Sequence, residues 1–147
     1  MLDIIIPAYK ANNTISKTLK SIERQSMKDK IRVVIVNDNP NDDYTNVIDC
    51  YKNTLDVTII NNPLNLGTSG ARFEGFNNSS SEFVLFCDAD DEYINFYSLE
   101  KMYNDMVLNE NIVCYSFGLL QEKKMEISMH QQHTIMCYQQ SCYAVLF

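Results

Sequence analysis

The feature that most constrains the fold is the regular alternation of short apolar runs with helical patterns. The apolar runs lie at residues 2–7, 31–36, 57–60, 83–87 and 112–117, and most of them are rich in Ile and Val. Between them apolar residues recur at helical spacing, as at Ile15, Leu19 and Ile22. Runs without polar alternation are typical of strands buried on both faces. The pattern predicts an α/β domain with a mostly parallel sheet flanked by helices.

The length of 147 residues indicates a single domain, because domains average roughly 150 residues. Residues 121–140 follow no clear period, and the apolar run at 142–147 has no terminating signal. We therefore expect a fold that is incomplete at its C-terminus. Residues 1–118 would form its core, and residues 119–147 would begin a further region that is cut short.

The net charge of −7 argues against a protein that binds the phosphate backbone of nucleic acids. No apolar run approaches the ~20 residues of a membrane span, and the N-terminus lacks the basic segment of a signal peptide. Five scattered cysteines without a C-x-x-C pair indicate reduced thiols, with a zinc site or a disulfide framework as the alternatives. We expect a soluble, cytoplasmic chain that touches a membrane at most at its surface, at the inner face of the cell membrane.

Polar residues that could carry chemistry directly follow three of the expected strands. Tyr9 and Lys10 follow the first, Asp38 follows the second, and an acidic cluster at residues 88–92 follows the fourth. Because the carboxyl ends of parallel strands meet at one edge of a sheet, these side chains should converge on one ligand crevice.

The acidic cluster holds four carboxylates in five positions, which repel one another unless they are solvated or bridged by a cation. Hard oxygen ligands suit Mg²⁺ or Mn²⁺. The alternative is a solvated acidic turn at the start of the next helix. An EF-hand is excluded, because Tyr93 and Leu99 stand where its loop needs glycine and glutamate. A phosphatase of the haloacid-dehalogenase type fits poorly, since its Asp-x-Asp lies near the N-terminus and is followed by Thr or Val.

A second feature is the pair Gly67 and Gly70, which opens a helix expected to run to about residue 77 with Thr68 or Ser69 as its cap. Free N–H groups at such a helix start could cradle a phosphate, although neither common phosphate-loop pattern is present. The alternative is a capped turn that requires a positive φ. Arg72 could hold a phosphate or a base edge, or be a solvated helix charge.

Four motifs in order resemble family 2 glycosyltransferases of the GT-A fold, over residues 2–109. They are IIIPAYK, SIERQSMKDKIRVVIVNDNPND, NPLNLGTSGARFEG and FVLFCDADDEY. The resemblance implies a GT-A, Rossmann-like sheet and a nucleotide-sugar site. The residues that it assigns to this site are Pro7, Ala8, Tyr9, Asp38, Gly67, Arg72, Asp88, Ala89 and Asp90.

The resemblance also implies roles for these residues. Tyr9 would stack on the nucleobase, and Asp38 would accept a hydrogen bond from it. Asp88 would lie by the ribose and the metal, and Asp90 would bind the metal, Mn²⁺ or Mg²⁺, that bridges the diphosphate. Such a cation stabilises the negative charge that develops on the leaving group.

The sequence departs from the family pattern at several positions. Lys10 replaces the usual Asn after Tyr9, Asn37 replaces the first residue of the usual Asp-Asp pair, Asn39-Pro40 stands for the common Gly-Ser, and Phe73 follows Ala-Arg where Asn is usual. Asp38 and Asp90 are kept. A nucleotide site is therefore expected, and its affinity or its preference for a base can differ from those of typical family members.

The implied function is transfer of a sugar from a nucleoside-diphosphate sugar, UDP-linked, to a hydroxyl of a glycan or lipid-linked acceptor by metal-assisted inverting displacement. Polysaccharide or glycoconjugate synthesis is the family's common bacterial role.

The general base of the family lies in the acceptor half, and no motif for it follows Asp90 here. The alternative is a nucleotide-sugar-binding remnant without turnover. Homo-oligomerisation stays open. A sugar-1-phosphate nucleotidyltransferase would need a glycine-rich loop that PAYKANNT does not provide.

Overall fold

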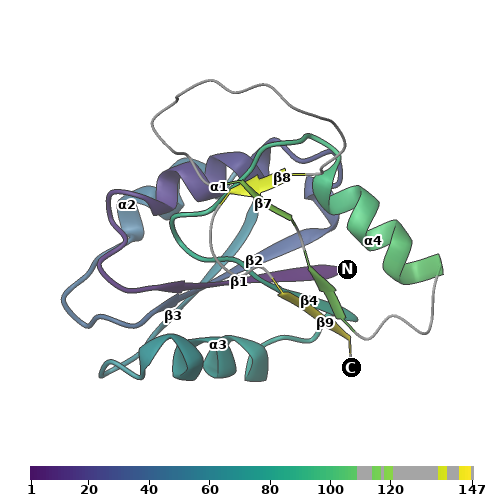
Figure 1. Ribbon diagram of the computed structural model, residues 1–147. Helices are drawn as coiled ribbons and strands as arrows, with labels where there is room; N and C mark the ends of the chain where they lie inside the picture. Colours follow the sequence, from purple (N-terminus) through teal and green to yellow (C-terminus); the bar gives the residue numbers. More distant parts are fainter. Residues whose placement is uncertain (109–113, 117, 121–135, 139–142, 147) are drawn as a thin grey trace.

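The computed structural model describes residues 1–108, 114–116, 118–120, 136–138 and 143–146. Its main sheet has six strands (Figure 1), which in spatial order are β3 (Asp56–Asn61), β2 (Ile31–Asn37), β1 (Leu2–Ala8), β4 (Phe83–Phe86), β9 (Tyr143–Leu146) and β6 (Cys114–Ser116). The first four strands are mutually parallel. β9 runs antiparallel to both of its neighbours, β4 and β6.

Helices cover both faces of the parallel strands (Figure 1). α1 (Ile15–Glu23) and α2 (Thr45–Tyr51) lie on one face, and α3 (Gly67–Asn77) lies on the other. A short 3₁₀ turn, η1 (Lys28–Lys30), precedes β2, and α4 (Ser98–Leu108) follows β4 and a smaller sheet strand. That smaller sheet has the order β5 (Glu92–Tyr93), β8 (Met136–Tyr138) and β7 (Gly118–Leu120). No helix in these described ranges is long and apolar enough to cross a bilayer.

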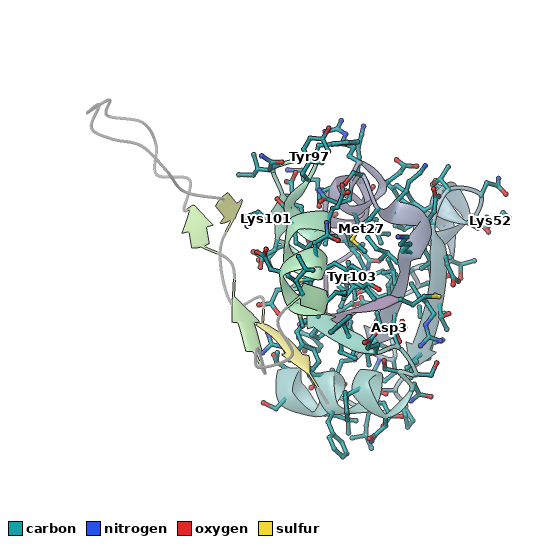
Figure 2. All side chains as sticks on the ribbon, turned by 90° about the vertical axis from the view of Figure 1, so that its right-hand side faces the viewer. Asp3, Met27, Lys52, Tyr97, Lys101 and Tyr103 are labelled. Atoms are coloured by element: carbon teal, nitrogen blue, oxygen red, sulfur yellow. The ribbon has the colours of Figure 1, made fainter. Side chains whose placement is uncertain are left out.

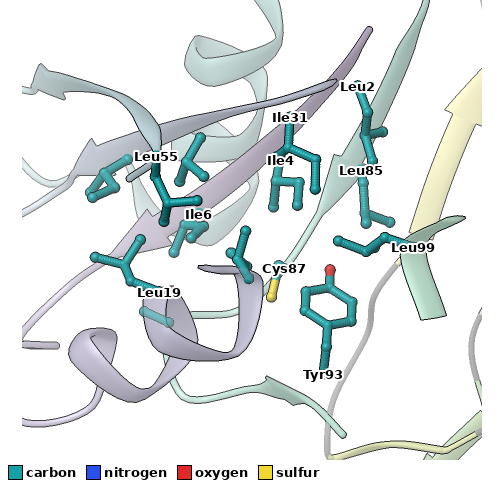
Figure 3. Packing of buried hydrophobic residues seen from close by; sticks show 14 of the residues in the cluster. Leu2, Ile4, Ile6, Leu19, Ile31, Leu55, Leu85, Cys87, Tyr93 and Leu99 are labelled. Atoms are coloured by element: carbon teal, nitrogen blue, oxygen red, sulfur yellow. The ribbon is translucent and has the colours of Figure 1, made fainter. Parts of the chain in front are cut away.

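The sheet separates two apolar layers because neighbouring side chains of a strand point to opposite faces. In β1, Ile4 and Ile6 pack with α1 and α4, whereas Ile5 packs against α3. Figure 3 shows the larger layer, in which Leu19 of α1 and Leu99 of α4 meet the strands. Burial on both faces explains why the strand sequences are apolar almost throughout.

On the second face, α3 approaches the sheet closely at Gly75. A Cβ added there would lie 2.4 Å from Cγ2 of Ile5 and 3.0 Å from Cγ2 of Val36. A glycine at this point therefore sets the distance between helix and sheet.

The expected alternation and the GT-A-like parallel sheet are confirmed. The predicted cap of α3 is wrong, because the helix begins at Gly67 and its N-cap is Leu66 rather than Thr68 or Ser69. The side chain of Asn65 instead binds the first residue of the helix, because its Oδ1 accepts the Gly67 N–H at 2.7 Å. Gly67 has φ +72°, the positive value expected of a glycine turn. The C-terminal apolar run supplies β9, and most of the aperiodic stretch at 121–140 lies outside the described residues.

Candidate functional site

The sheet order creates a crevice at the carboxyl ends of β1 and β4. The chain leaves β1 through α1 toward β2 and β3, and then returns through α3 on the opposite face to β4. Such a reversal of strand order is where ligands bind in open α/β sheets. A pocket of 580 Å³ opens at this edge, lined by Pro7, Ala8, Tyr9, Lys10, Ala11, Thr14, Asp38, Asn65, Gly67, Thr68, Ala71, Asp88, Ala89 and Asp90.

The pocket collects eight of the nine residues that the resemblance assigned to the nucleotide-sugar site. They come from separate segments at the end of β1 and just after it, after β2, at the start of α3 and after β4. The ninth, Arg72, does not line the pocket but binds one of its carboxylates. Tyr9 is half exposed at 49%, so its ring is accessible from the pocket.

Asp38 is buried at the end of β2 and holds the loop that leads into α3. Its Oδ1 accepts Nδ2 of Asn62 at 2.8 Å and the backbone N–H of Leu66 at 2.9 Å. Within the described ranges both side-chain bonds end on Oδ1. Oδ2 is therefore the oxygen that a ligand in the pocket can use.

The Asn37 side chain, at a position where the family has an acidic residue, has a structural role. Its Nδ2 donates to the Asp42 carbonyl and to Oδ1 of Asn61, each at 3.0 Å, and its Oδ1 accepts the Asn39 N–H at 3.1 Å. A carboxylate could not make the two donated bonds. Asn37 therefore shapes the loop beside Asp38 rather than the pocket itself.

Asp88 forms an ion pair with Arg72, whose Nη2 lies 2.7 Å from Oδ1 of Asp88. The guanidinium also lies over the ring of Phe86, with Cζ 5.8 Å from the ring centroid. Burial raises the pKa of Asp88, the nearby charge of Asp90 raises it further, and Arg72 opposes both effects. Arg72 thus fixes the orientation of Asp88 and favours its ionised form.

The acidic cluster divides in the structure. Asp88 and Asp90 line the pocket, Asp91 is buried, and Glu92 is exposed on β5. Only the first two carboxylates are therefore placed to meet a ligand in the pocket.

Lys10 lines the pocket, as its place after the first strand predicts, although the resemblance gave it no role. Five further residues line the pocket without having been assigned to it from the sequence, namely Ala11, Thr14, Asn65, Thr68 and Ala71. Asn65 and Thr68 flank the assigned Gly67. Nothing in the sequence indicates that Ala11 and Thr14 line the pocket, because both residue types also occur just before helices that line no pocket.

Comparison with known proteins identifies the family. The family model described as "Glycosyl transferase family 2" matches residues 3–146. The chain belongs to glycosyltransferase family 2. The match covers the strands, the helices and the pocket described above, and the fold is that of the GT-A glycosyltransferases.

Curated relatives of this family 2 chain are bacterial glycosyltransferases. It is 32% identical over 106 residues to a poly(ribitol-phosphate) beta-glucosyltransferase of Bacillus spizizenii, with 70% of this chain and 17% of the relative covered. It is 30% identical over 96 residues to a GalNAc(5)-diNAcBac-PP-undecaprenol beta-1,3-glucosyltransferase of Campylobacter jejuni, with 64% and 31% covered. The chain thus spans less than a third of the length of these relatives.

Solved structures share the fold of this glycosyltransferase chain. Residues 1–349 of S. aureus TarS in complex with UDP-GlcNAc superpose with a TM-score of 0.75 at 23% identity, covering 87% of this chain and 37% of that one. The mannosyltransferase PcManGT from Pyrobaculum calidifontis, in complex with GDP-Man and Mn²⁺, gives a TM-score of 0.71 at 19% identity and covers 82% and 35%.

The residues of the pocket fit a divalent cation of the Mg²⁺ or Mn²⁺ type. No group of three or more potential ligands gathers among the residues that the structure describes. Mg²⁺, however, is commonly held by one or two carboxylates together with substrate phosphates and water. Asp88 and Asp90 supply two carboxylates to one pocket, and a cation between them would offset both the burial that chiefly raises the pKa of Asp88 and the smaller effect of the Asp90 charge.

Proposed function

We propose that this chain binds a nucleoside-diphosphate sugar, UDP-linked, and forms the donor side of a glycosyltransferase that transfers the sugar to a hydroxyl acceptor with inversion. One observation carries the proposal. Tyr9, Asp38 and the pair Asp88–Asp90 come from three strand ends and line a single pocket at the reversal of strand order.

Each of these residues has a task in donor binding. The exposed ring of Tyr9 stacks on the nucleobase, and Oδ2 of Asp38 accepts an N–H of the base. Pro7, Ala8, Gly67 and Ala89 provide the walls, where small residues let the ligand approach the backbone. Arg72 keeps Asp88 oriented toward the pocket.

Asp88 and Asp90 would hold Mn²⁺ or Mg²⁺. When bound, the cation stabilises the negative charge that develops on the leaving nucleoside diphosphate. Arg72 pairs with Asp88 and favours the ionised form of this carboxylate that metal binding would require.

The names of two relatives, which state poly(ribitol-phosphate) and an undecaprenol-linked glycan, support a proposal for the acceptor class. We propose a glycan or lipid-linked acceptor in polysaccharide or glycoconjugate synthesis, with the chain in the cytoplasm or at the inner face of the cell membrane. Residues 1–118 form the donor core in this proposal, and residues 119–147 begin the acceptor side.

A second candidate is a nucleotide-sugar-binding chain without turnover. Inverting transfer needs a general base at the acceptor hydroxyl. In the described residues that line the pocket the carboxylates are Asp38, Asp88 and Asp90, and all three have tasks in donor binding. We therefore assign the general base to none of them.

Release of UDP distinguishes these functions. The purified chain is incubated with UDP-glucose or UDP-N-acetylglucosamine, Mn²⁺ and a hydroxyl acceptor of the proposed class, poly(ribitol phosphate), and free UDP is measured. A transferase releases UDP, the release stops with a chelator and in Asp90→Asn, and it continues in Glu92→Gln, which changes a carboxylate outside the pocket. Binding of UDP without release supports the second candidate. Absence of both binding and release from a folded chain contradicts both.

A further inference from the structure

Lys10, which lines the pocket, has an unusual backbone conformation. Its φ is +54°, in the left-handed region that lysine rarely adopts. Non-glycine residues in this region persist where the surrounding structure holds them, and they cluster at functional sites. The conformation of Lys10 is therefore a reason to ask what its side chain does.

Lys10 lies in the loop after β1, and residues of the loop after β2 hold its backbone in place. Oδ2 of Asp42 accepts the Lys10 backbone N–H at 2.7 Å and the hydroxyl of Tyr44 at 3.0 Å, and Oδ1 of Asp42 accepts Nδ2 of Asn12 at 3.1 Å. The Tyr44 hydroxyl in turn accepts the Ala11 N–H at 3.1 Å. All these bonds use the backbone of Lys10 or its neighbours, so the lysine side chain is left for the pocket.

The charge of Lys10 stands out in its surroundings. Among the described residues that line the pocket, Lys10 is the only cation, and Asp38, Asp88 and Asp90 are the anions. A nucleoside diphosphate that enters this pocket brings further negative charge. The ammonium of Lys10 is thus the one charged donor of the pocket lining that can meet an oxygen of the nucleotide directly.

At present the ammonium lies over the ring of Tyr9, with Nζ 5.2 Å from the ring centroid. Tyr9 is also the ring on which the nucleobase is proposed to stack, so base and ammonium share one aromatic surface. A hydrogen bond from an ammonium to a nucleotide oxygen is stronger than a contact with an exposed tyrosine ring. Exchange of one for the other is therefore favourable when the nucleotide binds.

We propose, building on the nucleotide site proposed above, that Lys10 binds the nucleotide from its position beside Tyr9, in a pocket that three carboxylates also line. Its ammonium leaves the Tyr9 ring when the base stacks and donates to an oxygen of the nucleotide. That oxygen belongs to the base carbonyl or to the diphosphate, and these two sources differ in their response to base identity and salt.

Calorimetric titration of wild type, Lys10→Met and Lys52→Met with UDP, CDP and uridine tests the proposal. Lys10→Met keeps a long side chain and the same backbone demand but removes the ammonium. Lys52 is an exposed lysine that directly follows α2, lies outside the pocket and provides the matched control (Figure 2).

We expect Lys10→Met to weaken UDP binding about 10- to 150-fold, the range of a charge-assisted hydrogen bond, and Lys52→Met to leave it unchanged. A loss shared by UDP and CDP, absent for uridine and reduced at high salt, assigns the contact to the diphosphate. A loss for UDP and uridine but not for CDP assigns it to O4 of the base, the carbonyl that cytosine lacks, and a loss shared by UDP, CDP and uridine assigns it to O2, which both bases carry.

Equal or tighter UDP binding by Lys10→Met, with wild type binding UDP, overturns the role of Lys10 and leaves the proposed function intact. Failure of folded wild type to bind any nucleoside diphosphate overturns the proposed function, and the role of Lys10 with it.

Discussion

Oδ1 of Asp38 accepts the backbone N–H of Leu66 at 2.9 Å, and this bond joins the end of β2 to the start of α3. The same oxygen accepts Nδ2 of Asn62 at 2.8 Å. One carboxylate oxygen therefore supports the fold, while the other is available to the ligand. Substitutions at this residue can separate the two tasks.

Asp38→Asn should separate them. An amide oxygen in the place of Oδ1 keeps both bonds, while an amino group in the place of Oδ2 cannot accept an N–H from a base. We expect stability within about 1 kcal/mol of wild type and UDP binding weakened by at least about tenfold. Asp38→Ala should lose both properties, with a cost of about 2–4 kcal/mol because the buried partners lose their acceptor. Urea unfolding and calorimetry measure the two effects, and equal UDP binding by Asp38→Asn would contradict the assigned contact.

Gln25 should prove structural rather than functional. Its Oε1 accepts the Leu99 N–H at 3.1 Å, and its Nε2 donates to the Asn95 carbonyl at 2.9 Å, so it fastens α1 to the start of α4. Gln25→Leu leaves these buried groups unpaired and should cost about 2–4 kcal/mol in urea unfolding. Lys17→Leu on the exposed face of α1 serves as the control. A change in UDP affinity of the folded Gln25→Leu chain would show that the contact also shapes the pocket.

Gly75→Ala should destabilise the chain even though alanine favours helices. The added Cβ would meet Ile5 at 2.4 Å and Val36 at 3.0 Å, so α3 must move away from the sheet. The expected cost is about 1–3 kcal/mol, the range of overpacked cores. Ser69→Ala, at an exposed position of the same helix, should be neutral or stabilising. Unfolding in urea compares the two variants, and a Gly75→Ala chain as stable as wild type would contradict the close approach.

Asp3 should make stability depend on pH. It is buried at the start of β1 (Figure 2) and accepts hydrogen bonds from the Arg32 guanidinium and from the hydroxyls of Ser79 at 2.5 Å and Ser81 at 2.6 Å. Burial raises the pKa of Asp3, but these hydrogen bonds outweigh burial and bring the pKa below its ordinary 3.8.

Because the folded-state pKa of Asp3 is depressed, its contribution to stability is present above the unfolded-state pKa and is lost as the pH falls through the folded-state value. Asp3→Asn should be less stable than wild type at pH ~7 by about 1–3 kcal/mol. Between pH ~5 and pH ~2 it should lose less stability than wild type. Asp49→Asn, at an exposed position of α2, is the control. Equal acid sensitivity of wild type and Asp3→Asn would contradict the account.

Much of the fold follows from local sequence properties. Strands buried on both faces must be apolar throughout, and this is why β1 and β2 could be located within a residue. The convergence of Asp38 and Asp88 follows from parallel strands ending at one edge. These expectations needed no knowledge of particular side-chain contacts.

Contacts between distant loops could not be predicted in the same way. Asp42 binds the backbone of Lys10, which lies 32 positions earlier in the chain, and neither residue belongs to a periodic pattern. The cap of α3 was misplaced because Thr68 and Ser69 have suitable side chains, whereas the start of the helix was set by the turn at Gly67 and by Asn65. Tertiary and loop geometry decided both cases.

The most direct test of the central claim is calorimetric titration of the chain with UDP in the presence and absence of Mn²⁺. We predict binding that strengthens with Mn²⁺, that loses this dependence in Asp90→Asn, and that keeps it in Glu92→Gln, whose carboxylate lies outside the pocket. Metal-independent binding would contradict the cation site. Absence of binding to UDP by a chain shown to be folded would contradict the nucleotide site. The chain would then share only its fold with the nucleotide-sugar-binding members of the family.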